Sequence, residues 1–129
     1  SYVERKNVSF LLNILEEMPE IHLVIAGNTL FPEKKENFLN EVKQRKLQSR
    51  VHTQGYISKK DLRRTYSLAQ AYILPSKYGG YEMTPLEAEK CGTPAIVYEK
   101  IPSAERVDLG RVFSEFEIKT VVSAIKNYI

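Results

Sequence analysis

The chain has 129 residues, of which 43% are hydrophobic and 27% are charged, and its formal net charge is +3. This size and composition are typical of one soluble globular domain with a core of its own. The sequence shows no signal-peptide pattern, and no apolar run approaches the roughly 20 residues of a membrane span. The single cysteine, Cys91, excludes an internal disulfide, so we expect a cytoplasmic protein.

The first half of the chain alternates between amphipathic and continuously apolar segments. In residues 8–18 the apolar side chains recur at helical spacing, and Asn7 is a suitable N-cap. Residues 21–27 form a short apolar run that ends at glycine, which is typical of a strand buried on both faces of a parallel sheet. A charged helix is predicted next at 33–46, and a short strand at 51–55.

The second half continues this alternation, beginning with a helix for which Ser58 is the predicted N-cap. Three more strands and a closing amphipathic helix are predicted at 71–74, 95–98, 111–113 and 118–125. Strands that alternate with helices form right-handed βαβ units, so the expected fold class is α/β, a three-layer α/β/α sandwich around a parallel sheet. Ligands of such sheets bind beyond the carboxyl ends of the strands.

The segment 75–94 joins two of these strands and contains, in order, a strand end, a glycine turn, a helix and a glycine stop. Thr84 is the expected N-cap of its helix, Pro85 the first helical residue, and Glu87 the partner that closes a capping box. Gly92 is expected at the C′ position. The turn leaves backbone N–H groups unblocked at a helix N-terminus, which suits an anion, most commonly a phosphate.

This segment resembles the donor-site signature of retaining, nucleotide-sugar-dependent glycosyltransferases with the GT-B fold, especially those of family 4. Their pattern runs roughly P-S-x-x-E-G-F-G-x-x-P-L-E-A-x-A-x-G-x-P-V. Nine positions match at fixed spacing: Pro75, Ser76, Gly80, Pro85, Leu86, Glu87, Ala88, Gly92 and Pro94. Tyr81 replaces the family's phenylalanine, the first glutamate of the family pair falls on Gly79, and the glycine after the aromatic residue falls on Glu82.

The resemblance implies that residues 1–129 form a single donor-binding, Rossmann-like domain, which is one lobe of a GT-B fold. It implies a partner lobe, N-terminal in the same protein, that binds the acceptor and to which nothing in these residues corresponds. The implied donor is a UDP-, GDP- or ADP-sugar, with no cofactor and no metal required in this lobe. The implied activity is retaining transfer of a hexose in glycan biosynthesis, and we expect the isolated chain to be inactive.

Two charged positions carry over from the resemblance. Lys6 matches the lysine that binds the donor diphosphate and stabilises the leaving group, and Arg5 is a weaker candidate for the same role. Glu87 matches a glutamate that accepts hydrogen bonds from the ribose hydroxyls, although the capping-box role competes for its carboxylate.

The remaining candidate positions surround the sugar, the diphosphate and the base. The positions whose backbone N–H groups are implied to approach the sugar or the diphosphate are Gly80, Tyr81, Met83 and Thr84. Tyr56 matches the region that frames the base, with simple packing as the alternative. Glu82 either supplies the catalytic carboxylate that Gly79 lacks or faces the solvent.

Two alternatives remain open from the sequence. The absence of the first glutamate favours a non-catalytic nucleotide- or sugar-binding module of the same fold.

In addition, eight basic residues and a single acid, Asp61, lie between Lys43 and Arg64. This stretch predicts either two solvated helix faces or a surface for peripheral contact with anionic membrane lipids. It lacks the interleaved aromatic side chains of a nucleic-acid platform, so we expect no nucleic-acid partner.

Overall fold

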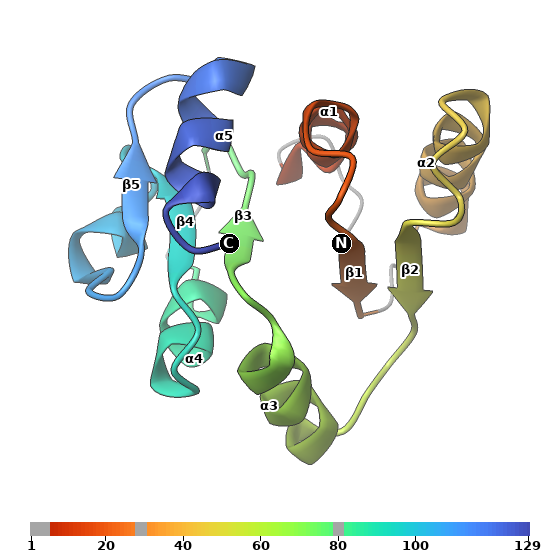
Figure 1. The fold of residues 1–129 in the computed structure, drawn as a ribbon. Helices are drawn as coiled ribbons and strands as arrows, with labels where there is room; N and C mark the ends of the chain where they lie inside the picture. The colour runs from red at the N-terminus through yellow and green to blue at the C-terminus, as the bar shows by residue number, and fades with distance from the viewer. Residues whose placement is uncertain (1–5, 28–30, 79–81) are drawn as a thin grey trace.

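The computed structural model describes residues 6–27, 31–78 and 82–129, which form one α/β lobe (Figure 1). In chain order the elements are α1 (Ser9–Glu17), β1 (Leu23–Ala26), α2 (Pro32–Gln44), β2 (Val51–Gln54), α3 (Lys59–Leu68), β3 (Tyr72–Leu74), α4 (Thr84–Lys90), β4 (Ala95–Tyr98), the 3₁₀ helix η2 (Pro102–Arg106), β5 (Arg111–Phe113) and α5 (Ile118–Lys126). Strands and helices therefore alternate as expected, and the α/β class is confirmed.

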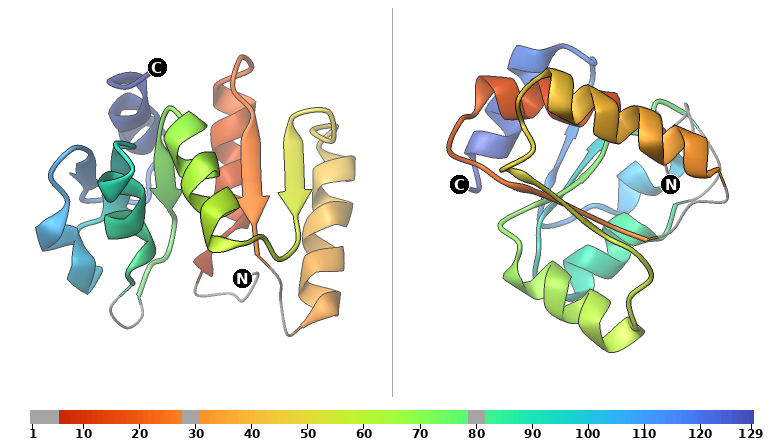
Figure 2. Two further views of the ribbon diagram at one scale, coloured as in Figure 1. Left: turned by 90° about the horizontal axis from the view of Figure 1, so that it is seen from below. Right: turned by 90° about the vertical axis from the view of Figure 1, so that its right-hand side faces the viewer.

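Helices cover both faces of the strands (Figure 2). Helices α1, α2 and α5 lie on one face, and α3 and α4 lie on the other, so the predicted three-layer α/β/α arrangement is confirmed. The core beneath the first group includes Leu12 and Leu15 of α1, which are almost completely buried. Burying a leucine side chain of this kind contributes about 1.5–3 kcal/mol, so α1 is anchored firmly over the strands.

The strands form two parallel ladders rather than the single parallel sheet that the sequence predicts. β1 pairs with β2, and β4 pairs with both β3 and β5. Within the described ranges, β1 and β3 are not hydrogen-bonded to each other. The apolar β1 is accordingly less buried than predicted: Val24 is 47% exposed, whereas Ile96 and Val97 of the doubly paired β4 are 0% exposed. Among the described residues, β1 is paired along a single edge. Part of its side-chain surface therefore stays in contact with solvent.

Two of the predicted helix ends are confirmed by their hydrogen bonds. The hydroxyl of Ser58 accepts a hydrogen bond of 3.1 Å from the backbone N–H of Asp61, which is the geometry of an N-cap. Gly92 follows α4 with φ +87°, and its N–H donates to the carbonyl of Glu89 at 3.0 Å. This left-handed conformation at C′ is the reason for the glycine.

The predicted N-cap of the first helix is wrong. Helix α1 begins at Ser9 with Val8 as its N-cap residue, and no side chain caps it. Asn7 has φ +56° and accepts a hydrogen bond at its carbonyl oxygen from the N–H of Phe10. Asparagine is one of the few residues other than glycine that adopt this left-handed conformation readily, so Asn7 turns the chain into the helix instead of capping it.

Candidate functional site

The loops that follow β1, β2 and β3 gather at one edge of the molecule, because these three strands point in the same direction (Figure 2). The N–H of Gly27, directly after β1, donates to the carbonyl of Gly55, directly after β2, at 3.1 Å. The loop that begins the signature follows β3 at Pro75. The predicted site segments therefore share the carboxyl edge of the strands, where α/β folds bind their ligands.

Lys6 and Glu82 form an ion pair at this edge. The ammonium nitrogen of Lys6 lies 2.5 Å from Oε1 of Glu82, and their side chains are only 18% and 14% exposed. Lys6 precedes α1 and Glu82 precedes α4, so the contact joins segments that are 76 residues apart in the sequence. The structure thus brings together the two residues for which the sequence predicts catalytic roles. A lysine ammonium has three donors, so it can bind a phosphate oxygen as well as a carboxylate.

Two buried polar atoms in the segments that carry this pair have no hydrogen-bond partner among the described residues. One is Nδ2 of Asn7, which follows Lys6, and the other is Oγ of Ser76, a fully buried residue in the loop after β3. Buried polar groups in folded proteins are hydrogen-bonded in the large majority of cases. The two groups are therefore exceptions to this rule within the segments that carry the predicted site.

The predicted capping box of α4 is wrong. Met83 is the N-cap residue and no side chain caps this helix. The hydroxyl of Thr84 instead accepts a hydrogen bond of 2.7 Å from the phenol of Tyr72 on β3. Burial raises the pKa of Tyr72 above its ordinary value, which keeps this phenol protonated as a donor. The N–H of Glu87 bonds to the carbonyl of Met83 at 3.0 Å, so Glu87 lies one residue too deep in the helix to close a capping box.

The change of role at Thr84 has a consequence for Glu87. The side chain of Glu87 is exposed on the first turns of α4. Its competing structural role is removed, because Thr84 is the first residue of α4 rather than its N-cap, and no side chain caps this helix. The binding of ribose hydroxyls by Glu87 stays a prediction. The capping-box role, which would have competed for the Glu87 carboxylate, does not occur in this helix.

Two of the remaining predicted site residues, Tyr56 and Met83, have exposed side chains. Tyr56 is 80% exposed and follows β2, the outer strand of its ladder. Met83 is 49% exposed at the start of α4. The positions Arg5, Gly80 and Tyr81 lie outside the described residues. Their assignments stay predictions. Sequence reasoning gave no role to Tyr72, which carries no motif signal, and none to Ser76 beyond its match to the signature.

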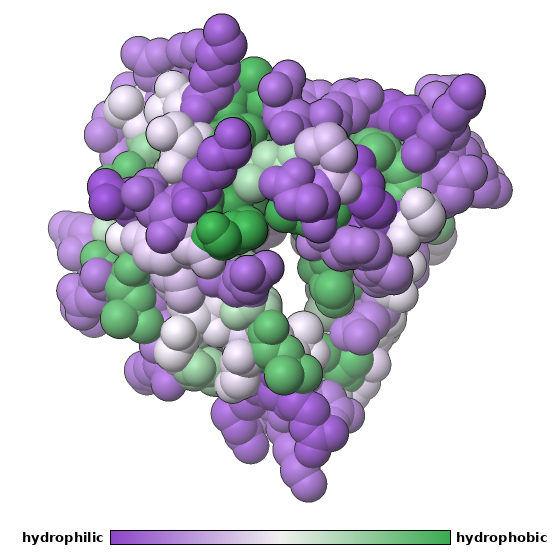
Figure 3. Space-filling view, viewed as in Figure 1, coloured by the Kyte–Doolittle hydropathy of each residue, from purple (hydrophilic) through white to green (hydrophobic). Residues whose placement is uncertain are grey.

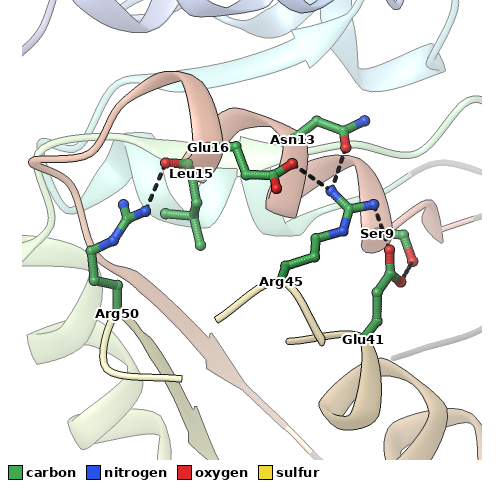
Figure 4. A network of polar contacts seen from close by, with 7 residues as sticks. All are labelled: Ser9, Asn13, Leu15, Glu16, Glu41, Arg45 and Arg50. Atoms are coloured by element: carbon green, nitrogen blue, oxygen red, sulfur yellow. Dashed lines mark hydrogen bonds and ion pairs between the residues drawn. The ribbon is translucent and has the colours of Figure 1, made fainter. Parts of the chain in front are cut away.

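The basic stretch between β1 and β3 is divided by the fold. Arg45 donates to Glu16 of α1 at 2.9 Å and to Glu41 of α2 at 2.6 Å, so it fastens α2 to α1 (Figure 4). Arg50 donates to the carbonyl oxygen of Leu15 at 2.9 Å (Figure 4). Helices α2 and α3 then lie on opposite faces of the strands (Figure 2). The basic residues therefore form separate helix faces rather than one continuous surface.

Within the described ranges, no group of three or more histidine, cysteine, aspartate or glutamate side chains is arranged to hold a metal ion. None of the helices in those ranges is both long enough and apolar enough to cross a membrane.

Parallel strands, helices on both faces and polar loops at the carboxyl edge define a Rossmann-like lobe of the GT-B type. The chain belongs to the family of glycosyl transferases group 1, whose family model matches residues 1–126.

Similar proteins agree with this assignment. Mannosylfructose-phosphate synthase of Agrobacterium fabrum is 33% identical over 90 residues, which are 65% of this chain and 20% of that protein. Sucrose-phosphate synthase of Thermosynechococcus elongatus matches with a TM-score of 0.88 at 23% identity, over 98% of this chain and 33% of that one. Anabaena HepE in complex with UDP and glucose matches with a TM-score of 0.84 at 17% identity, over 97% of this chain and 35% of that one. The chain thus spans about a fifth of the curated relative and about a third of the two structures.

Proposed function

We propose that this chain is the donor-binding lobe of a glycosyltransferase that uses a nucleotide diphosphate sugar. The observation that carries the proposal is the half-buried Lys6–Glu82 pair at the carboxyl edge of the strands. A cation held there suits a diphosphate. The structurally similar HepE is described with UDP and glucose bound, which supports a UDP-sugar as the donor.

In this proposal Lys6 stabilises the charge of the leaving diphosphate as the glycosidic bond breaks. Electrostatic stabilisation of a leaving group is the catalytic contribution that this lobe can make. The backbone N–H groups of Met83 and Thr84 add neutral donors at the start of α4. Glu82 pairs with the Lys6 ammonium, so a diphosphate bound to Lys6 would lie next to the Glu82 carboxylate. Glu82 is therefore the proposed catalytic carboxylate, and Glu87 the proposed ribose ligand.

The rest of the catalytic apparatus is proposed to come from a second lobe of the same protein. Retaining transfer of a hexose requires an acceptor held against the anomeric carbon of the donor, and such positioning accounts for much of the lowering of a reaction barrier. We therefore expect the 129-residue chain to bind a nucleotide diphosphate without turning it over. A cytoplasmic location belongs to the same proposal, as does peripheral membrane contact through the exposed basic residues of α3: Lys59, Lys60, Arg63 and Arg64.

Isothermal titration of the protein with UDP, GDP and ADP tests the proposal. Saturable binding of at least one of the three is the expected result. The absence of detectable binding to all three at millimolar concentration would contradict it. Binding without sugar transfer by the full-length protein, in a screen of donors, would favour the non-catalytic module that the glycine at position 79 suggests.

Replacing Lys6 by alanine is expected to weaken binding of the nucleoside diphosphate by roughly 10- to 100-fold. The reason is the loss of a charge-assisted hydrogen bond to phosphate, worth about 1.5–3 kcal/mol. Binding of the corresponding nucleoside should change little, because the ammonium is expected to touch only phosphate oxygens. Titration with UDP and uridine measures both effects. Lys119→Ala removes an exposed lysine from α5 and serves as the control. Equal losses for both ligands would show that Lys6 acts through stability instead.

Replacing Glu87 by glutamine is expected to weaken binding of ribonucleotides and to leave the melting temperature nearly unchanged. The structure removes the capping role of Glu87, so the substitution breaks no structural hydrogen bond. The loss of affinity should be smaller for the 2′-deoxy ligand, which already lacks one of the two hydroxyls. Titration with UDP and 2′-deoxy-UDP, together with thermal unfolding, measures these effects. A lower melting temperature with unchanged affinity would refute the ribose assignment.

A further inference from the structure

The carboxylate of Glu82 belongs to this chain and not to the signature that the chain matches, which has glycine at that position. Oε1 of Glu82 lies 2.5 Å from the Lys6 ammonium nitrogen, and the two side chains are only 14% and 18% exposed. The beginnings of α1 and α4, beside which the two residues lie, are at the same edge of the strands (Figure 2). A negative charge therefore stands at the edge where the diphosphate is proposed to bind.

A second carboxylate lies near the beginning of α4. Burial is the main cause of the raised pKa of Tyr72, and the negative charges of Glu82 and Glu87 raise it further. Both carboxylates are therefore close enough to act on the Tyr72 phenol, which donates to the Thr84 hydroxyl at 2.7 Å. The beginning of a helix ordinarily attracts anions, but here two fixed negative charges oppose that attraction.

The neighbouring basic side chains are directed elsewhere. The ammonium of Lys77, in the loop after β3, lies 5.9 Å from the centroid of the Phe116 ring. The hydrophilic side chains of α3 project from the surface of the molecule, away from the strands (Figure 3). Among the described residues, Lys6 is the basic side chain that an ion pair places against Glu82. Its positive charge is thus already engaged by a carboxylate before a ligand binds.

A diphosphate that binds Lys6 in this setting meets a like charge at close range. With hydrogen bonds of about 2.8 Å, two oxygens held by different N–H groups of one ammonium lie about 4.5 Å apart. Two negative charges at this separation repel each other strongly at a partly buried site, because the effective dielectric constant there is well below that of water. The single charge of Lys6 is too small to neutralise both a carboxylate and a diphosphate. A further positive charge is needed.

We propose that Glu82 and the diphosphate hold a divalent cation, Mg²⁺ or Mn²⁺, between them, so that the donor binds as its metal complex. This inference rests on the proposed function. Mg²⁺ is commonly bound by one or two carboxylates together with substrate phosphates, and water molecules complete its octahedral shell. Its two charges offset the Glu82 carboxylate and one phosphate. The glycine of the signature offers no such ligand, so the metal requirement belongs to the glutamate of this chain.

The proposed cation depends on the nucleotide for most of its ligands. Within the described ranges, no cluster of three or more histidine, cysteine, aspartate or glutamate side chains could hold a metal by itself. Phosphate oxygens supply what the protein lacks, so metal and nucleotide bind cooperatively. Each then raises the affinity for the other by the same factor. The cation also stabilises the charge of the leaving diphosphate, which adds to the contribution of Lys6.

Isothermal titration of the full-length protein with UDP, GDP and ADP, in MgCl₂ and in EDTA at matched ionic strength, tests the inference. Binding should be roughly 10- to 100-fold tighter with Mg²⁺, which is the scale of a close repulsion between like charges at a partly buried site. Equal affinity in the two buffers would overturn this inference and leave the proposed function standing. No binding of any of the three nucleotides in either buffer would overturn both.

Glu82→Gln assigns the effect to the carboxylate. The variant should bind the nucleotide more tightly than the unaltered protein in EDTA, because the repulsion is gone. Added Mg²⁺ should change its affinity by less than about threefold, because glutamine carries no charge to offset. Glu36→Gln removes an exposed carboxylate from α2 and should keep the full dependence on Mg²⁺. A Glu82→Gln variant that keeps the same dependence would overturn the inference.

Paramagnetic broadening in the unaltered protein locates the cation without any substitution. Mn²⁺ together with UDP should broaden the amide NMR signals of Met83 and Thr84, which follow Glu82. The amide of Gly110, which precedes β5 at the opposite edge of the strands, is the internal control and should stay sharp. Mn²⁺ without UDP should broaden neither group at the same concentration. Broadening that is equal with and without UDP, or that spares the start of α4, would overturn the proposal.

Discussion

Replacing Gly110 by alanine is expected to destabilise the lobe by more than about 4 kcal/mol, a loss that only a few kinds of substitution produce. A Cβ atom at this position would overlap the carbonyl oxygen of Ala95 and lie 2.5 Å from the backbone nitrogen and carbon of that residue. Ala95 is the fully buried first residue of β4. Because β4 is paired on both edges, its backbone cannot move aside without breaking two ladders.

Gly92→Ala is the matched control for this prediction. A Cβ at Gly92 would meet no atom within 4 Å, so its cost reflects the left-handed φ of +87° alone. That cost is about 1–2 kcal/mol for a residue with a side chain. Urea unfolding of both variants measures the difference. A loss of stability at Gly110→Ala no larger than at Gly92→Ala would show that the β4 backbone yields more easily than its double pairing suggests.

Glu89→Ala is expected to lower the free energy of unfolding by about 4 kcal/mol. Hydrogen bonds to charged groups contribute about 1.5–3 kcal/mol each, and water can replace the carboxylate at the two exposed amides, those of Asp108 and Leu109. The Glu89 carboxylate accepts four backbone N–H groups. They belong to Ala95 at 3.1 Å, Asp108 at 2.7 Å, Leu109 at 3.1 Å and Gly110 at 2.8 Å. One side chain of α4 thus holds the start of β4 and the turn that leads into β5. Alanine leaves these donors without their acceptor.

Two further variants make the Glu89 prediction specific. Glu36→Ala removes a carboxylate from the exposed surface of α2 and should change stability by less than about 0.5 kcal/mol. Glu89→Gln keeps one acceptor oxygen and should lower the free energy of unfolding by an intermediate amount. Urea unfolding of the three variants provides the comparison. Equal stability of Glu89→Ala and Glu36→Ala would mean that water replaces the carboxylate at all four amides.

The confirmed predictions rest on signals that act over a few residues. Ser58 caps α3 through an N–H three residues away, and Gly92 ends α4 by its own backbone conformation. The apolar periodicities likewise predicted every helix and strand of the described chain except η2. The spacing of the signature identified the family, because nine residue identities at fixed positions are a local property of the sequence.

The contacts between distant segments were not predictable in the same way. Thr84 was expected to cap its own helix, but the phenol of Tyr72, 12 residues away, engages its hydroxyl. Glu89 reaches amides 19 to 21 residues further along the chain, and no motif marks it for this role. A side-chain hydrogen bond of this kind leaves no periodic signal, since it depends on where the fold places a single partner.

The sequence by itself therefore determined the fold class, the family and the identity of Lys6 and Glu82 as candidates. Only the tertiary structure decided that these two charges meet within 2.5 Å, since their contact spans 76 residues. It also decided that Val24 of the apolar β1 is 47% exposed and that, among the described residues, β1 does not pair with β3. Local preferences select helices and strands, whereas the pairing of edges and charges depends on how the packed core sets those elements side by side.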